Sequence, residues 1–541
     1  MILMKSVRNV FLVLVIVSVV FASGYFLLAV KSSETRSDAM EVNGVSADRS
    51  LQGSTVLKSE AQYFSSGETF SIDARKVRKT IDGNEISMYG YNGQIPGPTL
   101  RVKQGSTLTV NFTNDLDVDT TVHWHGIRLK NEFDGVPRVT QKAIRPGDTF
   151  VYRLDFPDPG VYWYHPHVRE DFQQELGLYG NIIVEPSDPN YYNQVDGEET
   201  LILDDIRIAG VDVEAFSEDY VKRALMGRLG NVMMINGEEN YELGIDRGEK
   251  VRFYITDAAN ARTFNLSVEG QVMRLVGDDS GRYERDVSVN SIIISPGERR
   301  IVEIQFDKPG KFNVTHRTPS SEYVMGSVEV SDTGLNVGKK RSMSSPPDIK
   351  SSVYGFDGYL KKTPDIEIQL ESELSGMMSR TGGGGTMAHT MPDGSVMGSS
   401  MAMGESGPIE WEDDMFMMNS MSNSENTRWV IRDTKTGKKN DELVYGAAVG
   451  DIKKLRIYND PNSMHPMQHP LHLHGQRFLI LSQDGVPNQN LAWKDTVLVP
   501  KGSTVDILVD FSNPGVWLLH CHIPEHMESG MMIKFSVSEK P

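Results

Sequence analysis

The only cysteine of this 541-residue sequence, Cys521, stands between two histidines, His520 and His522. His526 follows five residues after the cysteine, and Met531 follows ten residues after it. A thiolate, two imidazoles and a weak thioether form the ligand set of a blue-copper electron-transfer centre. Cys521, His526 and Met531 supply three of these four ligands. A lone cysteine is otherwise an ordinary small buried residue, but the spacing of its neighbours argues against that interpretation.

The stretch 516–522 has the composition of a β-strand. Side chains alternate along a strand, so His520 and His522 would face one way and Cys521 the other. The spacing therefore predicts two metal sites that share one strand, back to back.

Eight of the thirteen histidines form four His-x-His pairs, far more than random placement would produce. The pairs are His123 with His125, His165 with His167, His472 with His474, and His520 with His522. On a strand, each pair projects both rings from one face. Eight converging imidazoles would hold about three metal ions, since each ion takes two or three nitrogens besides oxygen ligands. His469, just before the third pair, supplies the missing blue-copper histidine.

The elements that must position these residues repeat three times along the chain. The repeated stretches run from Asp155 to His165, from Gln305 to Thr315 and from Asp510 to His520, and each follows a turn at Gly147, Gly297 or Gly502. Short alternating segments such as 107–112 separate turns that contain Pro and Gly. This pattern predicts an all-β fold of sandwiches or barrels, in units at about 60–190, 191–335 and 340–541.

The middle unit has the same sequence repeat but lacks histidines at the positions of the predicted metal ligands. Thr315 stands where the outer units have His165 and His520. We therefore expect no metal ligand in the middle unit and interpret His316, one residue further on, as structural. His389 has no predicted role.

The N-terminal residues indicate in which cellular compartment the protein lies. Lys5 and Arg8 precede an uncharged run over 9–30, which is long enough to span a bilayer. We expect 1–30 to be a signal peptide or an uncleaved membrane anchor. The anchor is favoured over a buried helix by the basic flank, and over cleavage near Ala22 by the apolar residues beyond it. The rest of the chain would then be extracytoplasmic, periplasmic or on the cell surface, with 31–59 as a disordered linker.

Composition narrows the classes of partner. The formal net charge of −18 argues against nucleic acid and favours cationic ligands. A single cysteine excludes an internal disulfide framework.

Four motifs, HWHG at 123–126, HPH at 165–167, HPLHLHG at 469–475 and HCHIPEHMESGM at 520–531, make the sequence resemble the three-domain multicopper oxidases. The resemblance covers about 60–541 and implies three cupredoxin-like Greek-key domains that hold four copper ions. It implies type 1 copper ligands His469, Cys521, His526 and Met531, type 2 ligands His123 and His472, and type 3 ligands His125, His165, His167, His474, His520 and His522.

The same resemblance implies a reaction. A substrate gives electrons one at a time to the type 1 copper, and they pass through Cys521 to the three-copper cluster, where four electrons reduce O₂ to water. Asp134 resembles the acid that serves this cluster; without the resemblance, a turn-forming Asp-Gly would be the favoured explanation. In several relatives a second acid directly follows the last type 1 histidine. Met527 occupies that position here, and Glu525 or Glu528 would take over the role of the acid.

The substrate depends on a methionine-rich insertion. Residues 377–421 contain eleven of the 26 methionines among Gly, Ser, Asp and Glu. Thioethers suit Cu(I), and a low-complexity linker whose methionines have no role is the less favoured alternative. Near the type 1 site, Met467 matches a substrate-binding methionine of the periplasmic cuprous oxidases, and His465 stands where that site has an aspartate. Both residues would bind Cu(I), or would only pack around the type 1 copper.

Three functions remain. The sequence favours an oxidase of Cu(I), with a laccase that oxidises small organic phenols as the alternative. A copper-storage protein without turnover is disfavoured, because the four His-x-His pairs build an O₂ site that storage does not need.

Overall fold

Alternating apolar residues build the strands of this fold. In β6 (Thr107–Asn114), for example, Leu108, Val110 and Phe112 are buried, whereas Thr107 and Asn111 are exposed. The computed structural model describes residues 53–332, 349–375, 389–390, 396–397 and 407–540. Almost all regular structure in these residues is β, which confirms the predicted all-β class.

The first unit consists of two sheets. One sheet contains β1 (Ser54–Thr55), β3 (Glu68–Ile81), β4 (Asn84–Tyr91), β6 and β8 (Thr149–Asp155), and the other contains β2 (Ala61–Tyr63), β5 (Thr99–Lys103), β10 (Gly180–Glu185), β9 (Gly160–His165) and β7 (His123–His125). The unit also contains two short helices, η1 (Asn131–Phe133) between β7 and β8 and α2 (Glu170–Gln173) between β9 and β10.

The middle unit repeats this arrangement. One sheet contains β14 (Val232–Ile235), β11 (Gly197–Ile206), β16 (Lys250–Asp257), β21 (Arg299–Gln305), β18 (Met273–Asp278) and β19 (Gly281–Val289). The other contains β15 (Tyr241–Asp246), β23 (Glu322–Ser331), β22 (Gly310–Arg317), β17 (Phe264–Val268) and β20 (Ile292–Ile294), and β12 (Ile208–Ala209) pairs with β13 (Asp212–Val213). Apolar side chains from both sheets form one buried core between them, which makes the unit a sandwich.

The third unit carries the same two sheets. One sheet contains β27 (Thr427–Asp433), β24 (Ile366–Leu374), β29 (Asp451–Asn459), β34 (Thr504–Phe511), β31 (Arg477–Gln483) and β32 (Val486–Pro487), and the other contains β28 (Val444–Ala448), β36 (Met532–Ser538), β35 (Gly515–Cys521), β30 (His469–Leu473) and β33 (Thr496–Val499). Its helices are α3 (Ile349–Ser352), α4 (Phe356–Lys361), α5 (Phe416–Met421), η2 (Asn440–Glu442) and α6 (Pro524–Glu528), and β25 (His389–Thr390) pairs with β26 (Val396–Met397).

The sequence repeat corresponds to one strand in each unit. Strands β9, β22 and β35 occupy the same position in their sheets, and each begins at a glycine with a positive φ: 157° at Gly160, 136° at Gly310 and 138° at Gly515. A backbone angle in this region favours glycine. The predicted repeat is therefore a structural repeat of one bend followed by one strand.

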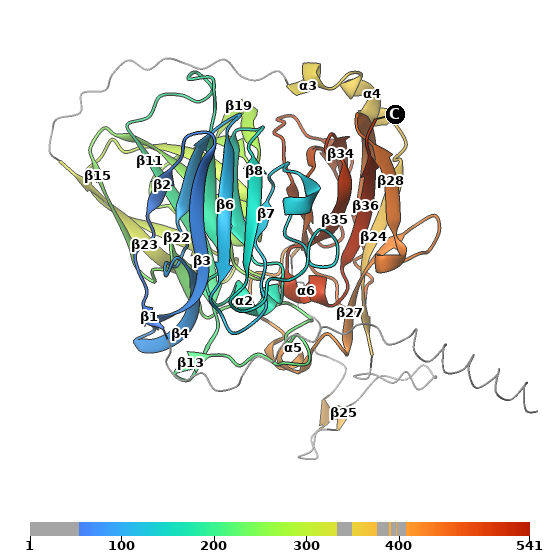
Figure 1. The fold of residues 1–541 in the computed structure, drawn as a ribbon, viewed down its shortest axis with the longest axis horizontal. Coiled ribbons are helices and arrows are strands. Elements are labelled where there is room, and N and C mark those ends of the chain that lie inside the picture. The colour runs from blue at the N-terminus through green and yellow to red at the C-terminus, as the bar shows by residue number, and fades with distance from the viewer. Residues whose placement is uncertain (1–52, 333–348, 376–388, 391–395, 398–406, 541) are drawn as a thin grey trace, which may run out of the picture. The chain divides into compact units, whose positions relative to one another are not determined.

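All described residues belong to one compact unit, 46–541. In Figure 1 the first unit runs from blue to teal and the third from yellow to red, and α2 and α6, which contact each other, are drawn side by side. The core of the third unit also contains Leu225, Met226 and Leu229 of the middle unit. The outer units and the middle unit therefore share buried surface around α6.

The predicted disordered linker ends earlier than expected. Strand β1 pairs in parallel with β3, and Leu57 bridges to Gln94, so residues 54–57 belong to the first unit. Residues 54–57 are ordered despite their polar composition because main-chain pairing at a sheet edge does not require apolar side chains. The predicted anchor at 1–30 lies outside the described residues. Within the part of the chain that the structure describes, no helix is both long and apolar enough to cross a membrane.

Candidate metal centre

A buried thiol and two imidazoles meet where β30 and β35 pair. Cys521 Sγ lies 3.7 Å from His469 Nδ1 and 3.7 Å from His526 Nδ1. Leu471 faces Cys521 across the two strands, which brings His469 to the same end of the sheet. After Cys521 the chain turns through α6, where Pro524 at the helix start sets the turn, and returns with His526. The predicted blue-copper histidine and cysteine ligands therefore converge.

Met531 lies in the same buried core as Cys521 and is fully buried, whereas its neighbour Met532 is partly exposed. The Met531 backbone donates a hydrogen bond to His526 O at 3.0 Å, and Cys521 N donates to Met531 O at 3.1 Å. These two bonds close the loop from 521 to 531. The loop brings the fourth predicted ligand back to the thiol.

Trp429 covers both imidazoles of this site. Its ring centroid lies 4.2 Å from that of His526 and 4.8 Å from that of His469, and the side chain is fully buried. The indole N–H donates to Ala224 O of the middle unit at 2.7 Å. No spacing in the sequence identifies this residue.

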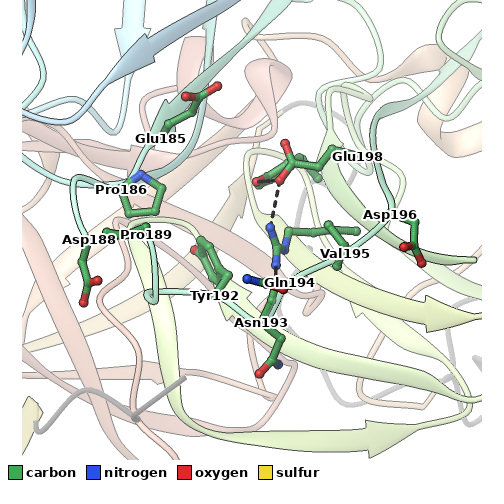
Figure 2. A pocket seen from close by; sticks show the side chains of 12 residues that line it. Glu185, Pro186, Asp188, Pro189, Tyr192, Asn193, Gln194, Val195, Asp196 and Glu198 are labelled. Atoms are coloured by element: carbon green, nitrogen blue, oxygen red, sulfur yellow. Dashed lines mark hydrogen bonds and ion pairs between the residues drawn. The ribbon is translucent and has the colours of Figure 1, made fainter. Parts of the chain in front are cut away.

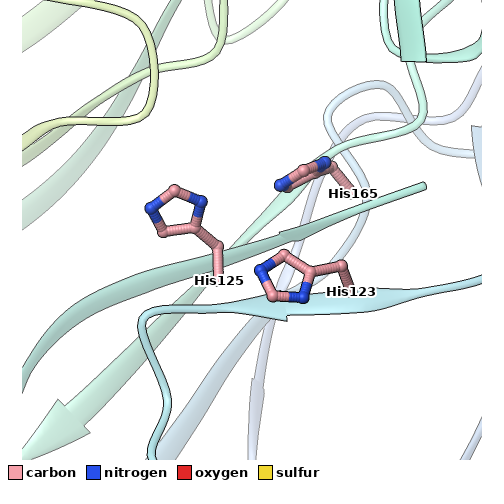
Figure 3. A group of neighbouring side chains, drawn as sticks. All are labelled: His123, His125 and His165. Carbon is pink, nitrogen blue, oxygen red and sulfur yellow. The ribbon is translucent and has the colours of Figure 1, made fainter. Parts of the chain in front are cut away.

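The second group of histidines assembles by strand pairing. His123 of β7 faces His165 of β9, and His472 of β30 faces His520 of β35. Residues that face each other in an antiparallel pair project from the same side of the sheet. Figure 3 shows the result for the first unit, where the rings of His123, His125 and His165 lie close together.

The outer units then bring their histidines to one place. The stacked rings of His123 and His474 have centroids 4.0 Å apart, and those of His125 and His472 are 3.6 Å apart. Ligand atoms of His167, His474 and His520 all lie within 4.8 Å of one another. All eight predicted histidines of the four pairs are buried in this cluster.

One ring nitrogen of most cluster histidines is held, which leaves the other free. The Nδ1 atoms of His123, His165, His472 and His520 donate to the backbone carbonyls of Asp134, Pro166, Asp495 and Cys521 at 2.7–3.0 Å. His125 is reversed, because its Nε2 lies 3.1 Å from Asp495 Oδ1 and 3.0 Å from Thr496 Oγ1.

The free nitrogens fit copper. Within the part of the chain that the structure describes, several ring nitrogens of the cluster have no hydrogen-bond partner: Nε2 of His123, His165, His167 and His472, Nδ1 of His125, and both nitrogens of His522. His474 Nε2 and His520 Nε2 face each other at 2.9 Å. Leaving a buried polar atom unpaired costs about 1–3 kcal/mol, and bound ions would relieve this cost. Imidazole and thiolate are the donors that copper prefers.

Burial keeps these donors neutral. It is the main cause that lowers the pKa of His469 to about 3 and that of His520 to about 3. It also raises the pKa of the Cys521 thiol well above its ordinary value. The imidazoles are therefore ready to bind a cation, whereas the thiol must lose its proton to do so.

Asp134 contacts the cluster with its side chain. Its Oδ2 accepts a hydrogen bond from His474 Nδ1 at 3.0 Å, and its Oδ1 lies 3.4 Å from His123 Nδ1. The turn explanation also has a basis, since a Cβ on Gly135, which has a φ of 84°, would lie 2.0 Å from Val122 O. The turn therefore presents the carboxylate to the histidines.

Several partners of the cluster have no signal in the sequence. Asp495 and Thr496 hold His125, and Arg299 of the middle unit forms a bidentate ion pair with Asp495. Glu170 Oε1 lies 3.1 Å from His167 Nδ1. Of these contacts, only that of Glu170 has a possible sequence signal, because Glu170 follows His167 by three residues, the spacing of neighbours on a helix.

Glu525 and Glu528, the predicted substitutes for the second acid, have different surroundings. Asn260 of the middle unit donates to Glu525 Oε1 at 3.3 Å. Burial raises the pKa of Glu525 to about 8 and that of Glu528 to about 7, with Asp171 as the next cause for both. Burial likewise raises the pKa of Glu170 well above its usual range. Of these acids, Glu170 is the one placed against a predicted ligand.

The middle unit shows what replaces the ligands. Ser267 of β17 faces Thr315 of β22, at the position of the pairs His123/His165 and His472/His520, and the two hydroxyls lie 2.8 Å apart. His316 is buried, accepts a hydrogen bond from Asn265 N at 3.0 Å and stacks on Tyr323. These contacts are those of a structural histidine.

His465 and Met467 are both buried beside the thiol site. Met467 belongs to the core that contains Cys521. The ring centroids of His465 and Trp429 lie 6.2 Å apart, and among the described residues His465 Nε2 has no hydrogen-bond partner. Burial, with Lys501 as a second cause, lowers the pKa of His465 to about 4. The structure therefore places both residues near the predicted type 1 ligands.

The described end of the methionine-rich insertion packs on the fold. Glu410 and Gln468, the neighbour of His469, exchange two hydrogen bonds at 2.8 and 3.0 Å. Asn419 donates to Gly227 O of the middle unit at 3.0 Å. Met415 and Met418 pack against the core that contains Cys521. Residues 407–421 therefore pack against the core that contains Cys521 and against Gln468, the residue before His469.

A pocket of about 520 Å³ lies elsewhere, along the connection between the first two units (Figure 2). Its lining includes Tyr192 and the ion pair between Glu198 and Arg252 at 2.8 Å. None of the predicted copper ligands line it.

Comparison with known proteins identifies the family. Residues 73–189, 208–341 and 412–541 match three profiles, each described as multicopper oxidase. The chain is 28% identical to the multicopper oxidase MmcO of Mycobacterium tuberculosis over 94% of this chain and 93% of that protein. It is 25% identical to a multicopper oxidase of Staphylococcus aureus over 87% and 89% of the two chains.

Solved structures show the same fold. The laccase-like multicopper oxidase CueO of Ochrobactrum sp. superposes with a TM-score of 0.67 at 22% identity, over 89% of this chain and 100% of that one. The three profiles together span most of the chain, and the histidine and cysteine clusters lie in the first and third of them. The chain therefore belongs to the multicopper oxidase family.

Proposed function

We propose that this multicopper oxidase holds four copper ions and couples the one-electron oxidation of Cu(I) to the reduction of O₂. Four Cu(I) ions, one O₂ and four protons would give four Cu(II) ions and two waters. The bound copper ions supply the electron transfer and the reduction of O₂. His469, Cys521, His526 and Met531 would hold the type 1 ion, and the eight paired histidines would hold the other three.

The chain itself provides the connection between the two sites. Cys521 contributes to the thiol site, and its neighbours His520 and His522 contribute to the histidine cluster. The two sites are therefore joined by a few covalent bonds of β35. This short connection supports electron transfer over storage, because a storage protein has no need to link its sites.

Asp134 would hold and deliver protons at the cluster. Its carboxylate is buried and contacts His474, so it stands within reach of a group that is reduced there. Proton transfer by a positioned carboxylate is ordinary general acid catalysis.

The unpaired Nε2 of His465 carries the proposal that Cu(I) is the substrate. This nitrogen is buried and near Trp429, which contacts both type 1 imidazoles. A neutral imidazole and the thioether of Met467 are soft donors that suit Cu(I). Residues 407–421 support the same substrate, because a segment packed beside the thiol site disfavours bulky phenols and admits a small ion.

The test compares two substrates in one protein. In the double variant His465→Ala and Met467→Leu, we expect kcat/KM for Cu(I) to fall by about tenfold or more. The type 1 absorption and the oxidation of a phenol should stay unchanged, since neither residue is assigned to that copper. The matched control is His316→Ala, which removes a buried histidine with an unpaired Nε2 from the middle unit. An equal loss for Cu(I) and phenol would favour packing roles and a laccase.

The compartment is part of the same proposal. The basic flank and uncharged run of 1–30 support an exported or membrane-anchored protein that meets Cu(I) outside the cytoplasm.

A further inference from the structure

We propose that Arg299 of the middle unit is a positioning residue for the three-copper cluster. It acts through Asp495, whose side chain and backbone hold one histidine from each outer unit. The middle unit would then have a chemical role although it supplies no predicted copper ligand. This inference rests on the copper centre proposed above.

The ion pair at the centre of this proposal is completely buried. Both Arg299 and Asp495 have an exposed fraction of 0%. Arg299 Nη1 donates to Asp495 Oδ1 at 2.6 Å, and Nη2 donates to Oδ2. Such a bidentate pair fixes the plane of the carboxylate as well as its position.

The guanidinium is itself held by all three units. Arg299 Nε donates to Val161 O of the first unit at 2.9 Å, and Nη1 donates to Gly297 O of its own unit at 2.9 Å. Asp279 of the middle unit accepts from Arg299 N at 2.9 Å and from Asp495 N at 3.2 Å. The middle unit therefore holds Asp495 at both its carboxylate and its backbone N–H.

Asp495 transmits this orientation to two predicted ligands. Its carboxylate lies 3.1 Å from His125 Nε2 and 3.4 Å from Nδ1 of His472, the predicted type 2 ligand, and its backbone carbonyl accepts from His472 Nδ1 at 3.0 Å. The two rings stack with an interplanar angle of 15°. The contact at Nε2 is the reason that His125, unlike the other held histidines, turns Nδ1 towards the cluster.

Two glycines show how closely the middle unit approaches. A Cβ on Gly126, the last residue of the HWHG motif, would lie 2.4 Å from Asp495 Oδ2 and 2.7 Å from Arg299 Nη2. A Cβ on Gly297 would lie 2.8 Å from the His522 ring and 3.2 Å from His125 Cε1. Both positions require glycine because the ion pair and the turn of the middle unit pack directly on the ligands.

Hydrogen-bond partners of metal ligands fix ring orientation, and their loss typically weakens metal binding by about 10–100-fold. In Arg299→Met we expect a type 2 copper signal with altered hyperfine splitting in electron paramagnetic resonance. Loss of cluster copper to a chelator should become about 10–100-fold easier. The blue absorption should be unchanged, because the thiol site does not contact Asp495.

Arg300→Met is the matched control. Arg300 follows Arg299 on β21. Its guanidinium is mostly buried, with a side chain 14% exposed, but its partners are Asp278 and Glu298. It should keep the wild-type type 2 spectrum. A wild-type spectrum and wild-type copper retention in Arg299→Met would overturn the proposal, as would the same change in both variants.

A second variant keeps the test decisive if Arg299→Met does not fold. The double variant Arg299→Met and Asp495→Asn removes both buried charges, which proteins often tolerate. It should fold and still show the altered type 2 spectrum, since the side chain at position 495 is no longer held by the guanidinium; an unchanged spectrum would refute the role of Arg299. Wild-type protein without a type 2 signal would instead refute the copper centre itself.

Discussion

Replacement of Asp134 separates two roles that its position allows. The carboxylate accepts from His474 Nδ1 at 3.0 Å, so it orients a predicted ligand, and it also stands ready to carry a proton. Asp134→Ala removes both roles. Asp134→Asn keeps an oxygen that accepts the His474 hydrogen bond but removes the exchangeable acid.

The expected losses of copper binding and turnover follow from the burial of Asp134. Asp134 is 1% exposed, so Asp134→Ala leaves a buried His474 N–H without a partner, at a cost of about 1–3 kcal/mol. This cost corresponds to about 10–100-fold weaker copper binding. Asp134→Asn should lower copper binding by less than about tenfold, because the acceptor remains. Its turnover should fall by about 10²–10⁴, which is the usual contribution of a positioned acid.

The assay measures copper retention against a chelator and O₂ consumption in the same preparations. Glu132→Ala is the control, because Glu132 is an exposed acid on η1, two residues from Asp134. It should change neither quantity. Wild-type turnover in Asp134→Asn would refute the proton role, and full copper retention in Asp134→Ala would refute the positioning role.

Three further predictions concern the thiol site and the methionine-rich insertion. Cys521→Ser should lose the blue absorption and the activity while the histidine cluster still binds copper, and a blue variant would contradict the assignment of Cys521. Met531→Leu should raise the type 1 potential because it removes a weak axial ligand, whereas Met532→Leu should leave the potential unchanged; voltammetry showing the reverse would mean that the loop register is wrong by one residue. Deletion of 376–406, which removes seven methionines and spares the packed residues 407–421, should lower Cu(I) oxidation and leave phenol oxidation unchanged; unchanged Cu(I) kinetics would make the deleted part a linker.

The repeated features of the fold were predictable because each has a local cause. A glycine with positive φ starts β9, β22 and β35, and the stretches after it have the alternation of a strand. The replacement of a histidine by Thr315 was also visible in the alignment of the three repeats. Its partner Ser267 was not, because strand pairing and not sequence spacing brings them together.

The residues around the metal centre were harder to predict for the same reason. Asp495 lies 21 residues after His474, and Arg299 comes from a different unit, so only the folded chain brings them to His125. Trp429 has no periodic relation to His469 or His526, although it contacts both. The structured residues 54–57 depend on main-chain pairing, which composition does not reveal.

The central claim is that oxidation of Cu(I) is coupled to complete reduction of O₂. Its most direct test measures O₂ uptake and Cu(I) loss together in the copper-loaded protein, with a peroxide assay and a phenol as the competing substrate. We predict four Cu(I) ions oxidised per O₂, no peroxide, and a higher kcat/KM for Cu(I) than for the phenol. Release of peroxide, or a clear preference for the phenol, would contradict the account.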